Sequence, residues 1–314
     1  MDLQVCIVIP TFNRAHCIEQ AVEASLGQSH ANAVVLVIDD ASTDGTSNAL
    51  VRFGDNPRFC YVRLATNLGT AGAKNVGILL AGNRAVTFHD SDDIPHRDKV
   101  LRQSRVMNAD NICADSRMNW AVANQVAGTD LRIGAVLSHH ELVLPNGRRV
   151  EVRRPISMID DVFPNLQLGS HIPGDWTHIN SGLFHPEVFR KFGGFSDCIE
   201  EDREFRNRLI LGGEIIWMID DILLTKIETP DSLTQSAATD YHSARRAADR
   251  RRVWDKVDHW LATRTVEPEP INLPDLEVSA ISRPDVLLRS AALATLATKH
   301  RVDALFGGPA RQAS

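Results

Sequence analysis

The sequence VTFHDSDD at residues 86–93 places a short β-forming run directly before three aspartates. The sequence VVLVIDD at residues 34–40 repeats the arrangement, because an apolar run ends there in two aspartates. An apolar strand that brings carboxylates to its carboxyl end is how an open α/β sheet forms a ligand site. Two such strand ends, the second of which spells Asp-x-Asp, predict a divalent metal that holds a nucleotide diphosphate at one edge of a sheet.

Strand and helix patterns alternate through residues 5–88. Continuous apolar runs, typical of strands buried on both faces of a parallel sheet, lie at residues 5–9, 33–38, 59–64 and 85–88. Between them we expect a helix with Ile18, Val22 and Leu26 on one face, and helices at residues 46–53 and 70–80. Asn13 is a candidate N-cap of the first helix, and Thr43 or Asp44 of the second. This order predicts an α/β fold with a doubly wound, mostly parallel sheet flanked by helices.

The remainder of the chain has a less regular pattern. We expect helices at 98–107, 157–166, 186–192 and 201–211 and strands at 120–126, 132–143 and 214–219. Beyond residue 235 the pattern predicts a helical C-terminal extension at 236–314, with a helix at 241–261, a Pro-rich linker near 265–275 and an Ala-rich helix at 285–306. The expected domain therefore covers residues 1–235, with a nucleotide-binding half at 1–95 and an acceptor-binding half at 96–235.

Composition excludes several classes of protein. Of the 314 residues, 43% are hydrophobic and 24% charged, which is ordinary for a globular protein, and the net charge of −6 argues against a general nucleic-acid binder. The five cysteines form no Cys-x-x-Cys pair, which favours a reducing compartment without a disulfide framework. With no signal-like segment and no apolar run of membrane-spanning length, we expect a cytoplasmic protein whose membrane contact, if any, is peripheral.

Four motifs follow one another in the order seen in a known family. They are IPTFNR at 9–14, DDASTDGT at 39–46, NLGTAGAKNVG at 67–77 and DSDD at 90–93. With them, residues 3–235 resemble the family 2 glycosyltransferases, which have the GT-A fold. The resemblance implies an inverting, metal-dependent enzyme that moves a sugar from a nucleotide-sugar donor to a saccharide or lipid-linked saccharide.

The resemblance assigns a donor site to the strand ends. It implies that the nucleotide is bound by Thr11, Asn13, Arg14, Asp39, Gly69, Lys74, Asp90 and Ser91. Within this set Lys74 would face the phosphates and Asp90 the ribose, while Gly69 and Gly72 would let the backbone approach the nucleotide closely. A carboxylate at position 39 can accept a hydrogen bond from a uracil N–H, which favours a UDP-sugar.

The Asp-x-Asp sequence suits a hard divalent cation, Mn²⁺ or Mg²⁺. The resemblance implies Asp92 as the principal ligand, with Asp90 as a second. Capping of a following helix is the alternative explanation for these acids. Many relatives carry a further His after the last strand, where this chain has KIETPDSLT at 226–234, so Lys226 is a candidate contact for the diphosphate instead.

The acceptor half contains the candidate catalytic base. GGFSD at 193–197 and EDREFRNR at 201–208 resemble the Gly-Gly-Phe and Glu-Asp motifs of the family. Inverting transfer needs a base that takes the proton of the acceptor hydroxyl. We expect Asp202 to be this base, with Glu201 as the alternative, and Arg208 to pair with these acids. A simple preference of acids for a helix N-terminus would explain the same pattern.

Two further segments bear on partners. The resemblance places Asp175 and Trp176 in the acceptor cleft, where the indole could stack on a sugar or merely pack in the core. The arginines at 245–252 fit either a solvated helix face or contact with anionic lipid headgroups. The Ala-rich tail could pack on the domain or on a second subunit. Two other functions stay open: a sugar-nucleotide pyrophosphorylase, which would need a Gly-rich loop that 9–14 lacks, and a non-catalytic sugar-nucleotide binder.

Overall fold

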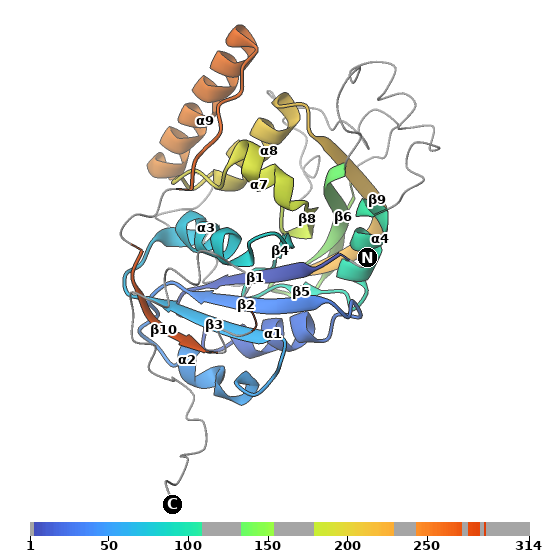
Figure 1. Ribbon diagram of the computed structural model, residues 1–314, viewed down its shortest axis with the longest axis vertical. Coiled ribbons are helices and arrows are strands. Elements are labelled where there is room, and N and C mark those ends of the chain that lie inside the picture. The colour runs from blue at the N-terminus through green and yellow to red at the C-terminus, as the bar shows by residue number, and fades with distance from the viewer. Residues whose placement is uncertain are drawn as a thin grey trace, which may run out of the picture.

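The computed structural model describes residues 3–108, 133–153, 179–228, 243–271, 276–282 and 286. A ten-stranded sheet runs through these residues in the order β10-β3-β2-β1-β4-β8-β6-β9-β5, with β7 beside β6 (Figure 1). The expected elements at 120–126 and 157–166, the loop at 171–178 and nearly all of the tail at 285–306 lie outside the described residues.

The first part of the domain, residues 3–88, has the predicted alternation of parallel strands and helices. Its elements are β1 (Val5–Thr11), α1 (Ile18–Leu26), β2 (Ala33–Asp39), α2 (Thr46–Ala49), a 3₁₀ turn η1 (Val51–Phe53), β3 (Phe59–Leu64), α3 (Gly69–Ala81) and β4 (Ala85–Phe88). Strands β3, β2, β1 and β4 are parallel neighbours. Their carboxyl ends therefore lie at one edge of the sheet, and the loops that follow these strands lie at that edge too.

Alternate residues of β1 fill two cores on opposite faces of the sheet. Cys6 and Val8 belong to the core that α3 covers, whereas Val5, Ile7 and Ile9 pack in the core that α1 covers. Figure 1 shows α3 on one side of these strands and α1 and α2 on the other. Complete burial on both faces explains why β1 is apolar without alternation.

Helix α3 lies unusually close to β1. A Cβ atom at Gly77 would lie 2.3 Å from Cγ1 of Val8, so only a glycine permits this approach. The contact with β1 thus sets the distance between α3 and the sheet, including that of its N-terminal residues.

The rest of the domain, which we call the acceptor half after its expected role, adds antiparallel strands to the same sheet. It contains β5 (Ile94–Pro95), α4 (Lys99–Met107), β6 (Ile133–Val143), β7 (Arg149–Val152), η3 (Ile179–Ser181), β8 (Leu183–Phe184), α7 (Pro186–Phe192), α8 (Glu201–Leu211) and β9 (Ile215–Ile227). Strand β8 runs antiparallel to both β4 and β6, while β6 and β9 are parallel. Strand β9 is longer than the strand predicted at 214–219, and its last residues come near β5 and the end of β4.

Aromatic packing joins the two halves. The ring centroid of Phe195 lies 4.6 Å from that of Phe205 on α8 and 5.2 Å from that of Phe88 on β4. Phe184 and Phe189 complete the cluster. The strand that precedes the acidic run therefore rests on the segment that precedes α8.

Arg208 is fully buried in α8, but its partner differs from the prediction. It pairs with Glu204, four residues earlier, and donates to the carbonyl oxygens of Phe192 at 2.5 Å and Gly194 at 2.9 Å. Residues four apart share a helix face, whereas Glu201 and Asp202 lie seven and six positions before Arg208. The expected pairing with those two acids is therefore wrong, and Arg208 anchors the Gly-Gly segment instead.

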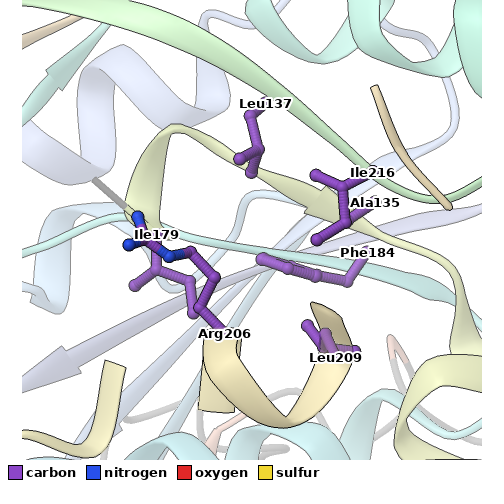
Figure 2. A pocket seen from close by; sticks show the side chains of 7 residues that line it. All are labelled: Ala135, Leu137, Ile179, Phe184, Arg206, Leu209 and Ile216. Carbon is purple, nitrogen blue, oxygen red and sulfur yellow. The ribbon is translucent and has the colours of Figure 1, made fainter. Parts of the chain in front are cut away.

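A cavity of about 10 Å³ lies between β6, β9 and α8 (Figure 2). That is room for about one water molecule and far below the size of a substrate pocket. Its walls are mainly apolar side chains of the acceptor-half core: Ala135, Leu137, Ile179, Phe184, Arg206, Leu209 and Ile216. The cavity is a packing feature of the core.

The C-terminal part is not wholly helical. Helix α9 (Ala244–Thr263) projects beyond α8, as predicted for 241–261, but β10 (Val278–Ser282) is a strand that pairs antiparallel with β3 (Figure 1). The segment expected as a linker is fixed at Glu269, whose backbone N–H donates to Phe192 and whose carbonyl accepts from Gly194. Residues beyond α9 thus return to the domain and complete its sheet.

Candidate functional site

Two loops at the carboxyl ends of β1 and β2 bind each other. The backbone N–H of Asn13 donates to Ser42 Oγ at 2.9 Å, and Asn13 Oδ1 accepts from the backbone N–H of Thr43 at 2.8 Å. Asn13 has a φ of 53°, a left-handed conformation that asparagine tolerates. Its prediction as an N-cap is wrong, since Cys17 holds that position before α1. The N-cap of α2 is Gly45, so the prediction of Thr43 or Asp44 at that position is also wrong, although Asp44 accepts from the N–H of Thr46.

Asp39 ends β2 beside Thr11, its register partner on β1. The Asp39 carboxylate is buried and accepts from Tyr61 Oη at 2.5 Å and from the Ser42 N–H at 2.8 Å. Burial, followed by the hydrogen bond to Asp39, raises the pKa of Tyr61. Thr11 Oγ1 is buried and has no hydrogen-bond partner among the residues that the structure describes. The strand ends therefore combine a fixed carboxylate with a hydroxyl that a ligand could satisfy.

Asp40 holds the N-terminus of α3. Its two carboxylate oxygens accept from the backbone N–H groups of Leu68 at 2.6 Å and Gly69 at 2.9 Å. Burial raises the pKa of Asp40 to about 6 against the opposing effect of these hydrogen bonds. Gly69 has a φ of +75°, and open space surrounds the position that its Cβ would take. The bare backbone at Gly69 leaves room for the close approach expected there.

The acidic run after β4 forms one cluster. Asp90, Asp92 and Asp93 each have a carboxylate oxygen within 4.8 Å of the others. Lys226, near the end of β9, reaches the cluster, with Nζ 3.3 Å from Asp90 and 3.2 Å from Asp93. Arg14 from the first loop is also among the charges that act on Asp92. The structure thus brings the acidic run together with Lys226, which the sequence marked, and with the charge of Arg14 from the first loop.

Burial and mutual repulsion shape the protonation of the cluster. Burial raises the pKa of Asp93 to about 7, and burial and the Asp90 charge raise that of Asp92. For Lys226, the three carboxylates outweigh burial and raise the pKa of the ammonium. Such a cluster gains from a bound cation, because positive charge relieves the repulsion.

The candidate base region lies on the first turn of α8. Glu201 is 9% exposed and Asp202 is half-buried, with its Oδ1 accepting from the N–H of Arg203 at 2.7 Å. Glu201 Oε1 lies 3.1 Å from Nζ of Lys74, which is 3% exposed. Lys74 thus has a buried carboxylate partner on the other half of the domain. Ser91 is buried beside Asp90, and Asp175 and Trp176 lie outside the described residues.

Three relevant residues were not among the sequence candidates. Phe12 directly follows β1 and is 44% exposed, so an aromatic side chain is accessible next to Thr11 at this end of the strand. Asp93 belongs to the DSDD motif, but only the fold shows its carboxylate within the cluster. Asp40 was visible as the second acid of its motif, although nothing in the sequence identified its partners 28 and 29 residues away.

The arginine-rich helix α9 is partly paired. Arg246 and Arg250 each contact Oε1 of Glu200, at 3.2 and 3.1 Å, while Arg245 and Arg251 are exposed. The prediction that these arginines form a fully solvated face is therefore wrong, since Glu200 pairs with two of them. Among the described helices, none is long and apolar enough to cross a membrane.

Comparison with known proteins finds similarity to the same family that the sequence motifs resemble. Residues 6–141 match the family model described as glycosyl transferase family 2. This part of the chain is therefore similar to family 2 glycosyltransferases. An Escherichia coli protein named UDP-Glc:alpha-D-GlcNAc-diphosphoundecaprenol beta-1,3-glucosyltransferase WfgD is 36% identical over 114 residues, which cover 35% of this chain and 44% of that protein. The putative teichuronic acid biosynthesis glycosyltransferase TuaG of Bacillus subtilis is 34% identical over 122 residues, covering 38% of this chain and 48% of that protein.

The alignments thus span less than half the length of these curated relatives. Among solved structures, S. aureus TarS in complex with UDP-GlcNAc has a TM-score of 0.51 and 20% sequence identity, covering 73% of this chain and 60% of that chain. This similarity shows the fold, so the described domain has the GT-A architecture expected from the motifs.

Protonation of Asp40 should couple stability to pH. The pKa of Asp40 is about 6 in the folded state against an ordinary value of 3.8, so the folded protein binds the extra proton between these pH values. Lowering the pH from 7 to 4 should therefore raise the free energy of unfolding of the wild type relative to Asp40→Asn, by about 2 kcal/mol. Urea titrations at both pH values measure this difference.

Asp44→Asn is the matched control. Burial raises the pKa of Asp44, but hydrogen bonds from Thr46 and Ala15 outweigh it and lower the pKa, so Asp44 titrates below this window. Its stability difference from the wild type should stay constant between pH 7 and 4. If the difference in the free energy of unfolding between Asp40→Asn and the wild type also stayed constant, the pKa of Asp40 would not be raised in the folded state.

Proposed function

We propose that the protein transfers a sugar from a UDP-sugar to a hydroxyl group of a saccharide or lipid-linked saccharide, with inversion at the anomeric carbon. One observation supports this most directly: Lys74 of α3 lies 3.1 Å from Glu201 on the first turn of α8, and the charges of Asp90, at the end of β4, and of Asp202 also act on it. A donor held at the strand ends would therefore lie next to a carboxylate of the acceptor half. The relatives named for UDP-Glc and solved with UDP-GlcNAc agree with a UDP donor.

The nucleotide would bind at the ends of β1 and β2. Asp39 is held by Tyr61 and Ser42 with its oxygens at the sheet edge, where it can accept from the uracil N–H. The Thr11 hydroxyl would gain the partner that it lacks among the described residues. Phe12 supplies an exposed ring on which a base could stack, and such a contact is worth roughly 1–3 kcal/mol.

The acidic cluster fits Mn²⁺ or Mg²⁺. Asp90, Asp92 and Asp93 offer hard oxygen ligands close together. Burial, and after it the neighbouring carboxylates, raises the pKa values of Asp92 and Asp93, and a bound cation would offset both effects. A bound cation there would neutralise charge on the departing diphosphate. Lys226 already gives the cluster a positive charge and lies where it can also contact the diphosphate.

Asp202 is the proposed base. It is half-buried, whereas Glu201 is nearly covered and paired with Lys74, so Asp202 is the acid that an acceptor can reach. In the reaction, the acceptor oxygen forms a bond to the anomeric carbon as the bond to the diphosphate breaks. The acceptor proton passes to the Asp202 carboxylate, and UDP leaves with the electron pair of the broken bond.

Binding of UDP should depend on metal and on Asp92. In calorimetric titrations with Mn²⁺, the wild type should bind UDP, and Asp92→Asn should bind at least about tenfold more weakly because it removes one ligand charge. Asp55→Asn is the control, since this exposed carboxylate precedes β3 at the opposite end of the strand. UDP binding that EDTA leaves unchanged would contradict the metal site, and an absence of UDP binding would contradict the donor.

The product should carry an inverted anomeric centre. With the UDP-sugar that supports turnover, nuclear magnetic resonance of the product should show a β-linkage from an α-linked donor, and Asp202→Asn should lower kcat at least about 100-fold. Asp197→Asn removes an exposed carboxylate just before the same helix and should leave kcat unchanged. Retained configuration would rule out direct displacement, and a fully active Asp202→Asn would rule out the base.

A further inference from the structure

Lys74 lies between a carboxylate and two aromatic rings. Its Nζ lies 3.1 Å from Glu201 Oε1, 5.0 Å from the ring centroid of Phe195 and 6.0 Å from that of Phe88. The side chain is 4% exposed. An ammonium between two aromatic faces and a carboxylate already has its charge compensated, so it gains little from turning towards a ligand.

The charges around Lys74 come from both halves of the domain. Glu201, Asp90 and Asp202 act on it in that order of strength and outweigh burial, so the pKa of Lys74 is raised and the ammonium is retained. Burial in turn raises the pKa of Glu201 to about 7 despite the opposing charge of Lys74. The carboxylate of Glu201 therefore depends on Lys74 for its place in the interior.

The next residue of α3 adds a second link to the same region. Asn75 Nδ2 donates to the Phe195 carbonyl at 2.9 Å, and Asn75 Oδ1 accepts from the Phe195 N–H at 2.8 Å. A Cβ atom at Gly194 would lie 2.2 Å from Asn75 Oδ1, so the glycine allows this pair of hydrogen bonds. Lys74 and Asn75 together fasten α3 to the segment that leads into α8.

We propose that Lys74 is a positioning residue of the transferase site, which holds the first turn of α8 through Glu201 and so places Asp202 relative to Asp90, rather than a ligand of the diphosphate. This inference rests on the proposed function. Helix α3 is fixed to β1 at Gly77 and to Asp40 at its N-terminus, so it offers a rigid base from which the lysine can set α8. Glu201 is the residue of α8 that Lys74 contacts, and Asp202 remains the proposed base.

Lys74→Met tests the proposal, because it keeps the length of the side chain and removes its charge. Kinetics with the active UDP-sugar should show kcat lowered about tenfold to 100-fold by misplacement of the base, with KM for the donor and calorimetric UDP affinity within about threefold of wild type. Lys74→Arg should recover part of kcat. The exposed Lys191, replaced in Lys191→Met, is the control and should change neither quantity.

The partner variant separates positioning from general loss of structure. If Lys74 acts through Glu201, Glu201→Gln should lower kcat to a similar degree, and the double variant should be no worse than either single variant, since contacting groups are not additive. Additive losses would overturn the proposal. Lys74→Met could fail to fold because it leaves Glu201 without its counter-ion, in which case Lys74→Arg and Glu201→Gln carry the same test.

The outcomes distinguish this inference from the proposed function. A wild type that fails to bind UDP contradicts the function itself. A Lys74→Met variant with normal kcat, or one whose UDP affinity falls tenfold or more, contradicts the positioning role while the transferase assignment stands, and the second result would return Lys74 to the phosphates.

Discussion

The structure depends on the way in which buried carboxylates are neutralised at the carboxyl edge of the sheet. Acids at the ends of β2 and β4 and at the start of α8 would repel one another if they were left without partners. Asp40 is held by the N-terminal N–H groups of α3, Asp39 by Tyr61 and Ser42, and Glu201 by Lys74. Because Gly69, Tyr61 and Lys74 lie on elements other than those of the acids that they contact, these contacts fix how the loops and helices meet.

Helix α3 is the element that connects these contacts. Its N-terminus binds Asp40, its middle carries Lys74 and Asn75 towards the acceptor half, and Gly77 seats it on β1. The same helix therefore contacts both the carboxyl edge of the sheet and α8. In this arrangement a change in α3 would alter the distance between the proposed donor site and the proposed base, even without direct contact to either substrate.

The sequence predicted the features that depend on local pattern. The continuous apolar runs predicted the four parallel strands, and the position of residues 90–93 directly after a strand predicted an acidic site there. Contacts between distant residues could not be read in this way. Lys74 and Glu201 are 127 positions apart, and their pairing depends on the packing of Phe88 and Phe195 between the halves.

Strand β10 was missed for a related reason, since it lies after a Pro-rich stretch and is fixed by an edge of β3 that only the fold exposes. Arg208 was assigned to the wrong acids because three carboxylates lie within one helical turn of each other and only helix geometry selects Glu204. The candidate N-cap Asn13 has instead a turn conformation that binds a neighbouring loop. In each case a local preference gave way to a partner from elsewhere in the chain.

Hydrogen–deuterium exchange of the full chain, with and without UDP and Mn²⁺, tests the location of the donor site most directly. We expect slower exchange at residues 11–15, 39–46 and 90–93, because a nucleotide at the carboxyl edge would shield and order these loops. The opposite edge, around residues 54–58 before β3, should exchange at the same rate in both states. Protection at that opposite edge, or none at the three loops under conditions where UDP binds, would contradict a donor site at the carboxyl ends of β1, β2 and β4.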